Sequence, residues 1–134
     1  MKNVLNLVQT TLDTLLAEDG VRSFWGRRTE IDEDPKATEY IIYELNRDTA
    51  EVSADGDLLY RMTVVSLQYY VKYGKARTYQ GRCDAMDRMD SILSAMRKAG
   101  FGCPSGWFEI GDVDNVGFAT FRSEYEIPRA MEND

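Results

Sequence analysis

The stretch SADGDLLYRMTVVSLQYYVKYG, residues 53–74, decides the fold, because a turn signal there precedes a long run of strand-forming residues. Asp-Gly at residues 55–56 is typical of a β-hairpin tip, since both residue types tolerate positive φ. The run that follows is about twice as long as an ordinary strand of five or six residues. We therefore expect a hairpin whose second strand is longer than a compact core requires.

The flanking residues predict the rest of the hairpin. Thr63, Val65, Leu67, Tyr69, Val71 and Tyr73 alternate along the long strand and form its better core face. Upstream, ATEYIIYEL at residues 37–45 is apolar on both faces, as expected of a strand inside a sheet. TAEVS at residues 49–53 then leads into the hairpin tip. The hairpin thus joins two neighbouring strands of one sheet.

Two segments have the spacing of amphipathic helices. Residues 4–18 place Val4, Leu5, Val8, Leu12, Leu15 and Leu16 on one side of a 3.6-residue period. Residues 78–99 form the second helix, with Thr78 as its cap, Gly100 at its end and Phe101 packing behind it. Its expected core stripe is Tyr79, Cys83, Met86, Met89, Leu93 and Met96. Each helix is expected to cover the sheet with its apolar side.

The order of these elements predicts an α+β fold. Residues 107–110 and 116–127 are two closing strands, and residues 129–134 are a loose tail. Residues 22–36 have no periodicity and are expected to be an irregular loop. We therefore predict one domain, residues 1–134, in which two helices pack on one face of a mainly antiparallel sheet of about four strands. A β-hairpin projects from this sheet.

Composition limits the classes of function. The net charge of −7 argues against binding to the outside of duplex DNA through counterion release. No apolar run is long enough to span a bilayer, so we expect a cytoplasmic protein with no membrane contact. Cys83 and Cys103 have neither CxxC spacing nor a histidine beside them, and we expect both to be reduced. We interpret Cys83 as a small core residue and Cys103 as a loop thiol.

No motif predicts catalysis. Histidine is absent, which removes the commonest general base near neutral pH and the commonest metal ligand. The carboxylates at 30–34, 55–57 and 112–114 lie in charge runs or turns and lack calcium-loop spacing. The glycines in GRR, residues 26–28, and GKAR, residues 74–77, lack P-loop spacing. We expect no enzymatic activity, no cofactor and no bound metal.

Two features point instead to protein partners. Phe24, Trp25, Arg27 and Arg28 combine residue types that are enriched at interface hot spots, although Trp25 folding back to plug an end of the core is an equal alternative. A strand of about fifteen residues rises roughly 50 Å, so it either bends within the domain or projects from it. A projecting edge invites pairing with another chain. We expect a subunit interface that includes Leu58, Tyr60, Tyr69, Tyr70 and Tyr73.

The sequence resembles the tail terminator, or tail completion, proteins of long-tailed bacteriophages and prophages. The resemblance lies in the order of a helix, YIIYELN, a polar hairpin with ADGDLLYR, VVSLQYYV, a helix ending in GF, and two closing strands with YEIP. It covers nearly the whole chain. These proteins are often described as minor structural or head–tail joining proteins.

The resemblance implies a function in virion assembly. Six copies form a ring, a homohexamer, on the head-proximal end of the tail tube, stop tube polymerisation and join the tail to the head connector or stopper protein. DNA passes through the lumen without specific binding. In such a ring, residues 58–73 meet the adjacent subunit and residues 22–36 face the tube or the connector. The implied location is the tail or neck of the virion, after assembly in the host cytoplasm.

Two other hypotheses remain open at this point. The chain is either another neck or head-completion protein, although connector adaptors are mainly helical and this chain has much strand, or it is a cytoplasmic small-molecule-binding α+β domain. In that last case the tyrosines line a pocket between sheet and helices. A metabolite would then raise the thermal stability of the protein, whereas a terminator responds little to metabolites and binds tail tubes.

The hairpin prediction leads to one experiment. Deleting residues 54–59 is expected to lower the assembled mass, measured by light scattering, because the deletion removes the tip of the projecting ribbon. Assembly at unchanged mass would contradict a role of the hairpin in subunit contact.

Overall fold

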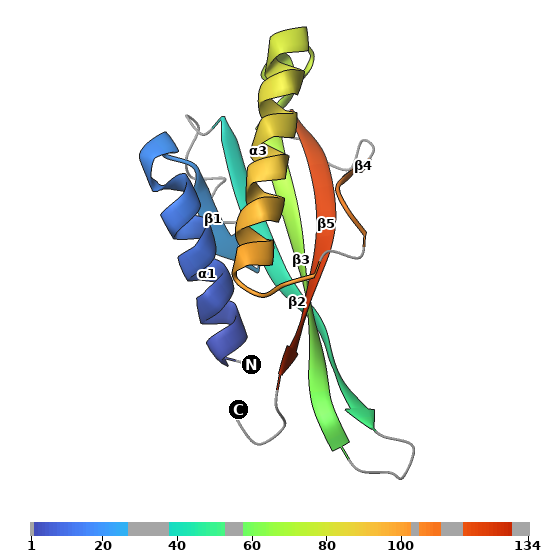
Figure 1. Cartoon of the computed structure of the whole chain (residues 1–134). Helices are drawn as coiled ribbons and strands as arrows, with labels where there is room; N and C mark the ends of the chain where they lie inside the picture. The colour runs from blue at the N-terminus through green and yellow to red at the C-terminus, as the bar shows by residue number, and fades with distance from the viewer. Residues whose placement is uncertain (1, 27–37, 53–57, 103–104, 111–116, 130–134) are drawn as a thin grey trace.

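The computed structural model describes residues 2–26, 38–52, 58–102, 105–110 and 117–129, and it shows an α+β arrangement (Figure 1). In these residues a five-stranded mixed sheet has the strand order β1-β2-β3-β5-β4. The helical elements are α1 (Lys2–Leu16), the 3-10 turn η1 (Ala17–Asp19), α2 (Tyr73–Ala76) and α3 (Tyr79–Lys98). The strands are β1 (Arg22–Trp25), β2 (Glu39–Val52), β3 (Leu58–Lys72), β4 (Phe108–Ile110) and β5 (Phe118–Arg129). The α+β class agrees with the prediction, whereas the numbers of helices and strands exceed it.

Strand β1 corrects the expectation of an irregular loop over residues 22–36. Arg22–Trp25 pairs in parallel with Tyr40–Tyr43 of β2 and forms one edge of the sheet. Four residues are too few for an alternating pattern to stand out, and the partner of a parallel strand lies far along the chain. Residues 27–36 lie outside the described part of the chain, as do residues 130–134 of the expected tail.

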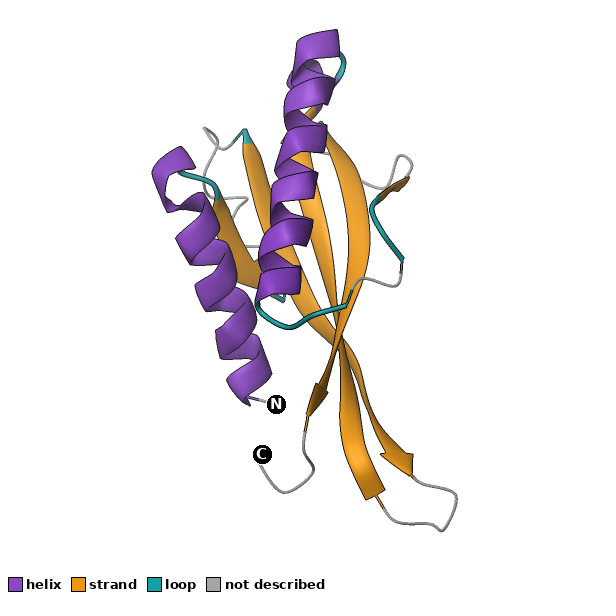
Figure 2. Cartoon of the chain, in the orientation of Figure 1, coloured by secondary structure: helices purple, strands orange, loops and turns teal. Residues whose placement is uncertain are grey.

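The long hairpin extends beyond the helices. Strands β2 and β3 have 14 and 15 residues and pair antiparallel along this length. Figure 2 shows their far ends continuing past the ends of both long helices. The register shifts between Leu45 and Arg47, which marks a β-bulge, and bulges bend a strand and increase its twist. The ribbon therefore both bends and projects.

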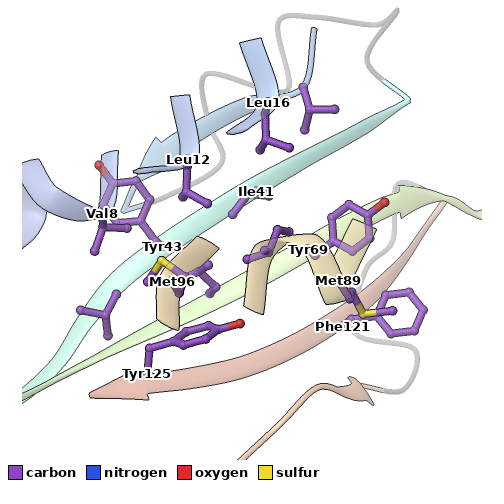
Figure 3. Close-up of a cluster of buried hydrophobic side chains, with 14 of the residues drawn as sticks. Val8, Leu12, Leu16, Ile41, Tyr43, Tyr69, Met89, Met96, Phe121 and Tyr125 are labelled. Carbon is purple, nitrogen blue, oxygen red and sulfur yellow. The ribbon is translucent and has the colours of Figure 1, made fainter. Parts of the chain in front are cut away.

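The main core lies between the two long helices and the sheet face that they cover (Figure 3). Helix α1 buries Val4, Val8, Leu12 and Leu16, which all belong to the predicted apolar side. On β3 the predicted core face is confirmed for the strand residues Thr63, Val65, Leu67, Tyr69 and Val71, which are all buried. Tyr73 already belongs to α2, because β3 ends at Lys72.

Helix α3 is rotated relative to its predicted stripe. Its buried residues are Gly81, Ala85, Met89, Ile92 and Met96. The predicted core residues Tyr79 and Met86 are 85% and 56% exposed, and Cys83 is a half-buried free thiol. The prediction followed the large apolar residues and passed over the glycine and the alanine, although small residues on a helix permit the closest approach to a neighbouring element.

A second cluster covers the opposite face of the sheet. It contains Phe24, Tyr40, Ile42 and Tyr70, with the partly buried Phe118 packed against them. The rings of Tyr40 and Tyr70 stack with centroids 4.6 Å apart. Strands β1, β2, β3 and β5 each supply a side chain to this cluster, so the centre of the sheet is buried on both faces.

The joint between α2 and α3 explains why Gly81 is buried. The Thr78 side chain accepts a hydrogen bond from the Gly81 amide at 2.9 Å and thereby caps α3, as predicted. The same hydroxyl donates to the Lys75 carbonyl at 2.9 Å, which brings that carbonyl against α3. A Cβ at position 81 would lie 1.9 Å from the Lys75 carbonyl oxygen, a backbone atom that cannot turn aside.

The other end of α3 follows the predicted termination. Gly100 has a positive φ of 106°. Its amide donates to the Arg97 carbonyl, and the Phe101 amide donates to the Met96 carbonyl, both at 3.0 Å. These two bonds are the Schellman pattern, in which a left-handed glycine satisfies the last carbonyls of a helix. Phe101 is buried behind the turn, so the helix end is fixed to the core.

Gly81→Ala is expected to lower the free energy of unfolding by about 2–3 kcal/mol, because the added methyl group overlaps backbone that has no room to move. Urea denaturation of the two proteins measures this difference. Gly74→Ala is the matched control, since a Cβ at that position has no atom within 4 Å. The control should be neutral or stabilising by up to about 1 kcal/mol. Equal effects of the two changes would contradict the close contact between α2 and α3.

Candidate functional site

The predicted hairpin residues are distributed over three different environments. Leu58 and Tyr60 lie in the far part of β3, where their backbones pair with Val52 and Glu51. Tyr73 begins α2. The side chains of Leu58, Tyr60 and Tyr73 lie outside the described part of the structure, so their contact with an adjacent subunit stays a prediction.

Tyr69 is a core residue of this chain, which corrects its assignment to a subunit interface. Its side chain is 1% exposed and faces the helices. The hydroxyl donates a hydrogen bond to Glu39, and the ring lies 6.4 Å from Trp107 and 6.2 Å from Phe121. Burial first, and then the bond to Glu39, raise the pKa of the Tyr69 hydroxyl far above its ordinary value. The expectation failed because Trp107 and Phe121 extend the covered area beyond the helices.

Tyr70 is also buried, on the opposite face of the sheet. It is 8% exposed, and its hydroxyl donates to the Gln68 side chain at 2.5 Å. Its ring is covered by the stacked ring of Tyr40. Tyr70 therefore stabilises the fold of its own chain, and it is not available to a neighbouring subunit in this conformation.

Arg88 connects the helical layer to the sheet below it. Its guanidinium donates to Asp19 at 2.5 Å and to Glu39 at 3.0 Å, and Glu39 also accepts the bond from Tyr69. Burial alone lowers the pKa of Arg88, but the hydrogen bonds to both carboxylates outweigh burial and raise that pKa above its usual range. One charged group thus holds the end of η1, the start of β2 and the middle of α3 together.

Phe24 and Trp25 are adjacent residues with opposite environments. Phe24 is 7% exposed and lies in the second cluster, with the Arg22 guanidinium 4.7 Å from the centre of its ring. Trp25 is 62% exposed, so it does not plug an end of the core. Of the residues predicted to contact the tube or the connector, Trp25 is therefore available on the surface. Arg27 and Arg28 lie outside the described residues.

The edge available for pairing differs from the predicted one, because β3 is paired with β2 on one side and, from Arg61 to Lys72, with β5 on the other, whereas part of β2 has no described strand partner on its outer side. Strand β1 covers this edge only along Tyr40–Tyr43. From Glu44 to Val52, no described strand pairs with β2 on the side away from β3. Unpaired backbone groups along a strand can accept a strand from another chain. Among the described residues, this part of β2 is therefore a candidate docking edge along the projecting ribbon.

The bulge residue Asn46 fixes the point where the ribbon leaves the body. The Ser66 hydroxyl donates to the Asn46 side chain at 3.1 Å, and the Asn46 amide donates to Glu124 at 2.7 Å. These bonds run from β2 to β3 and from β2 to β5. The Asn46 side chain thus connects three strands at the bend, which holds the direction of the ribbon.

A shallow depression of about 300 Å³ lies beside α3 and is lined by Lys75, Asp84, Asp87, Arg88 and Ser91. Among the described side chains, no three potential metal ligands come together. None of the helices in the described ranges is long and apolar enough to cross a bilayer.

Comparison with known proteins assigns no family. No family model matches the chain, and no curated protein matches it. The described residues define an α+β chain with an open strand edge, a projecting ribbon and an exposed tryptophan. A function has to be argued from these surfaces.

Replacing Arg88 by methionine is expected to lower the free energy of unfolding by about 2 kcal/mol, because Glu39 loses its cation while its side chain is only 11% exposed. Denaturant unfolding near pH 7 measures the loss. Arg82→Met on the same helix is the control. Arg82 pairs at 3.2 Å with Glu109, and both side chains are more than 40% exposed, so this change should cost less than about 1 kcal/mol. Equal losses of unfolding free energy in the two variants would show that the Arg88 contacts contribute no more to stability than an exposed ion pair.

Proposed function

We propose that this chain is a tail terminator of a long-tailed bacteriophage or prophage. Copies of the chain assemble as a ring on the head-proximal end of the tail tube, stop its polymerisation and provide the surface to which the head connector binds. The observation that carries the proposal is the β2–β3 ribbon, which extends past both long helices (Figure 1) and which, among the described residues, has no strand paired with the outer side of β2 from Glu44 to Val52. The similarity in element order to tail terminators supports the same function.

The open edge favours a protein partner. Backbone amides and carbonyls bind water when an edge is free, and they bind a strand when a partner docks there. The edge is not a generally adhesive surface, because charged residues such as Glu44, Arg47 and Asp48 lie along it, and charges with a bulge are the usual protection against indiscriminate pairing. These features fit an edge that pairs with one specific surface.

The direction of the ribbon is also fixed in advance. Asn46 ties β2 to β3 and to β5 where the ribbon leaves the sheet. Nearby, Asp48 accepts a hydrogen bond from Thr63 at 2.7 Å and pairs with Arg61 at 3.3 Å. A ribbon that is already oriented loses less conformational entropy when it docks. This is a useful property for a subunit that has to fit a repeating ring.

The negative charge is compatible with a channel for DNA. At −7 per chain, a ring of copies carries a large negative charge, and such a ring repels the phosphate backbone. DNA then passes without being held. The proposal includes no sequence-specific DNA contact.

The alternative of a small-molecule-binding domain has less support. Tyr69 and Tyr70, which would line its pocket, are packed against other side chains on opposite faces of the sheet. The depression beside α3 is shallow and lined by polar residues, whereas ligand pockets are mostly apolar and enclosed. Another neck protein remains the second candidate within the virion, and tube binding discriminates the two.

The test is to add the purified chain to the tail-tube protein of the same genome while tubes are growing. A terminator is expected to bind one end of each tube in electron micrographs and to shorten the length distribution, because a capped end adds no further subunits. An unrelated acidic protein of similar size and charge is the control. It should neither bind the tube ends nor change the length distribution. Tubes that grow to the same lengths with bare ends would overturn the proposed function.

A further inference from the structure

The two outermost strands of the sheet are short and lie at opposite edges. Strand β1 has four residues and pairs only with β2, whereas β4 has three and pairs only with β5. Within the described residues, the outer side of each strand has no strand partner. An exposed apolar surface lies beside each of these two edges.

At the β1 edge this surface is Trp25. Trp25 is opposite Tyr43 in the register, and neighbouring residues in a register point to the same face of a sheet. Tyr43 faces α1, because its hydroxyl donates a hydrogen bond to Gln9 of that helix. Trp25 thus lies on the helix-covered side of the sheet, yet it is 62% exposed.

At the β4 edge the surface is the flank of α3. Arg82 of α3 pairs with Glu109 of β4 at 3.2 Å, so this side of α3 faces β4. Tyr79 and Met86 are three residues before and four residues after Arg82, which places them on the same flank. They are 85% and 56% exposed. Glu109 is opposite Phe121, whose side chain faces the helices, so this flank also lies on the helix-covered side.

We propose that Trp25 of one copy of this chain packs against Tyr79 and Met86 of a second copy, with the β1 edge of the first beside the β4 edge of the second. Two features of the sheet favour a second copy of this chain as the partner. The exposed tryptophan and the apolar flank lie on the same side of the sheet, so continuing the sheet from one copy to the next brings them together. The two edge strands also run in opposite directions, because β1 is parallel to β2, and β3, β5 and β4 follow in alternating directions.

The resulting contact is antiparallel and closely matched in length. Antiparallel pairing is the commoner arrangement between neighbouring strands. Four residues on one edge meet three on the other, which leaves few backbone groups unpaired. The contact also covers three large side chains, which this chain leaves on its surface.

Such a contact uses different surfaces on the two copies and is therefore heterologous. A heterologous contact repeats from copy to copy and closes into a ring when the rotation between copies allows. Only the closing of copies into a ring rests on the proposed function. The contact between two copies forms without a tail tube. It adds a second surface to the one formed by the β2 ribbon.

The test uses two variants that each block one surface. Trp25→Glu removes the tryptophan side of the contact, and Met86→Glu places a charge in the α3 flank. Both side chains are largely exposed, so the variants should keep the far-ultraviolet circular dichroism of the unchanged chain. By light scattering, the unchanged chain is expected to form an assembly, and each variant alone is expected to show a lower mass than the unchanged chain, because it loses this contact.

The mixture of the two variants is the decisive sample. Met86→Glu still has Trp25, and Trp25→Glu still has an intact α3 flank, so a heterologous contact predicts that the mixture has a higher mass than either variant alone. Ser94→Glu is the matched control, because it adds the same charge to an exposed position on another face of α3. This control should assemble like the unchanged chain.

Three results would overturn the inference: an unchanged chain that stays monomeric at high concentration, variants that assemble like the unchanged chain, or a mixture with no higher mass than either variant alone. If both blocked variants cap tail tubes as well as the unchanged chain does, the proposed function holds and this contact is wrong. A higher mass in the mixture, together with tube ends that the unchanged chain leaves bare, would establish the contact and overturn the function instead.

Discussion

Strand β3 is hydrogen-bonded to β2 on one side and to β5 on the other from Arg61 to Val71, and the positions of the other elements depend on this pairing. Both of its faces are buried from Thr63 to Leu67 and again from Tyr69 to Val71. Val65 and Leu67 lie under the helices, whereas Val64 and Ser66 are buried on the opposite side. A central strand of this kind can be long without exposing its middle, so its extra length appears at the end, where the ribbon leaves the helical layer.

The elements that the sequence predicts well are those whose signals are local. Helix α1 has a regular apolar side, α3 has Thr78 and Gly100 at its ends, and the alternation along β3 is long enough to assign its faces. Strand β1 could not be predicted in this way, because a four-residue parallel strand is specified by a partner distant in sequence. The rotation of α3 was missed because the large apolar residues Tyr79 and Met86 are exposed, whereas the small residues Gly81 and Ala85 are buried.

The candidate surfaces could be predicted only in part from the sequence, because they too depend on contacts between residues distant in the chain. Aromatic residues on both faces of a strand suggested exposure, but the rings of Tyr40 and Trp107 cover Tyr70 and Tyr69 respectively. Trp25 was identified from residue type, but its exposure could not be separated in the sequence from the burial of its neighbour Phe24 on the same strand. The described part of β2 that lacks an outer strand partner depends on how β1 pairs with it, which no local pattern encodes.

The side-chain bonds of Asn46 have a mechanical consequence. A force along the ribbon loads β2 and β3 in shear against β5, and backbone hydrogen bonds perpendicular to the strands then share the load instead of opening one after another. Because Asn46 is bonded to both Ser66 and Glu124, tension that reaches the bend is distributed over three strands. A ribbon anchored in this manner can transmit a pull into the body of the protein without peeling away from it.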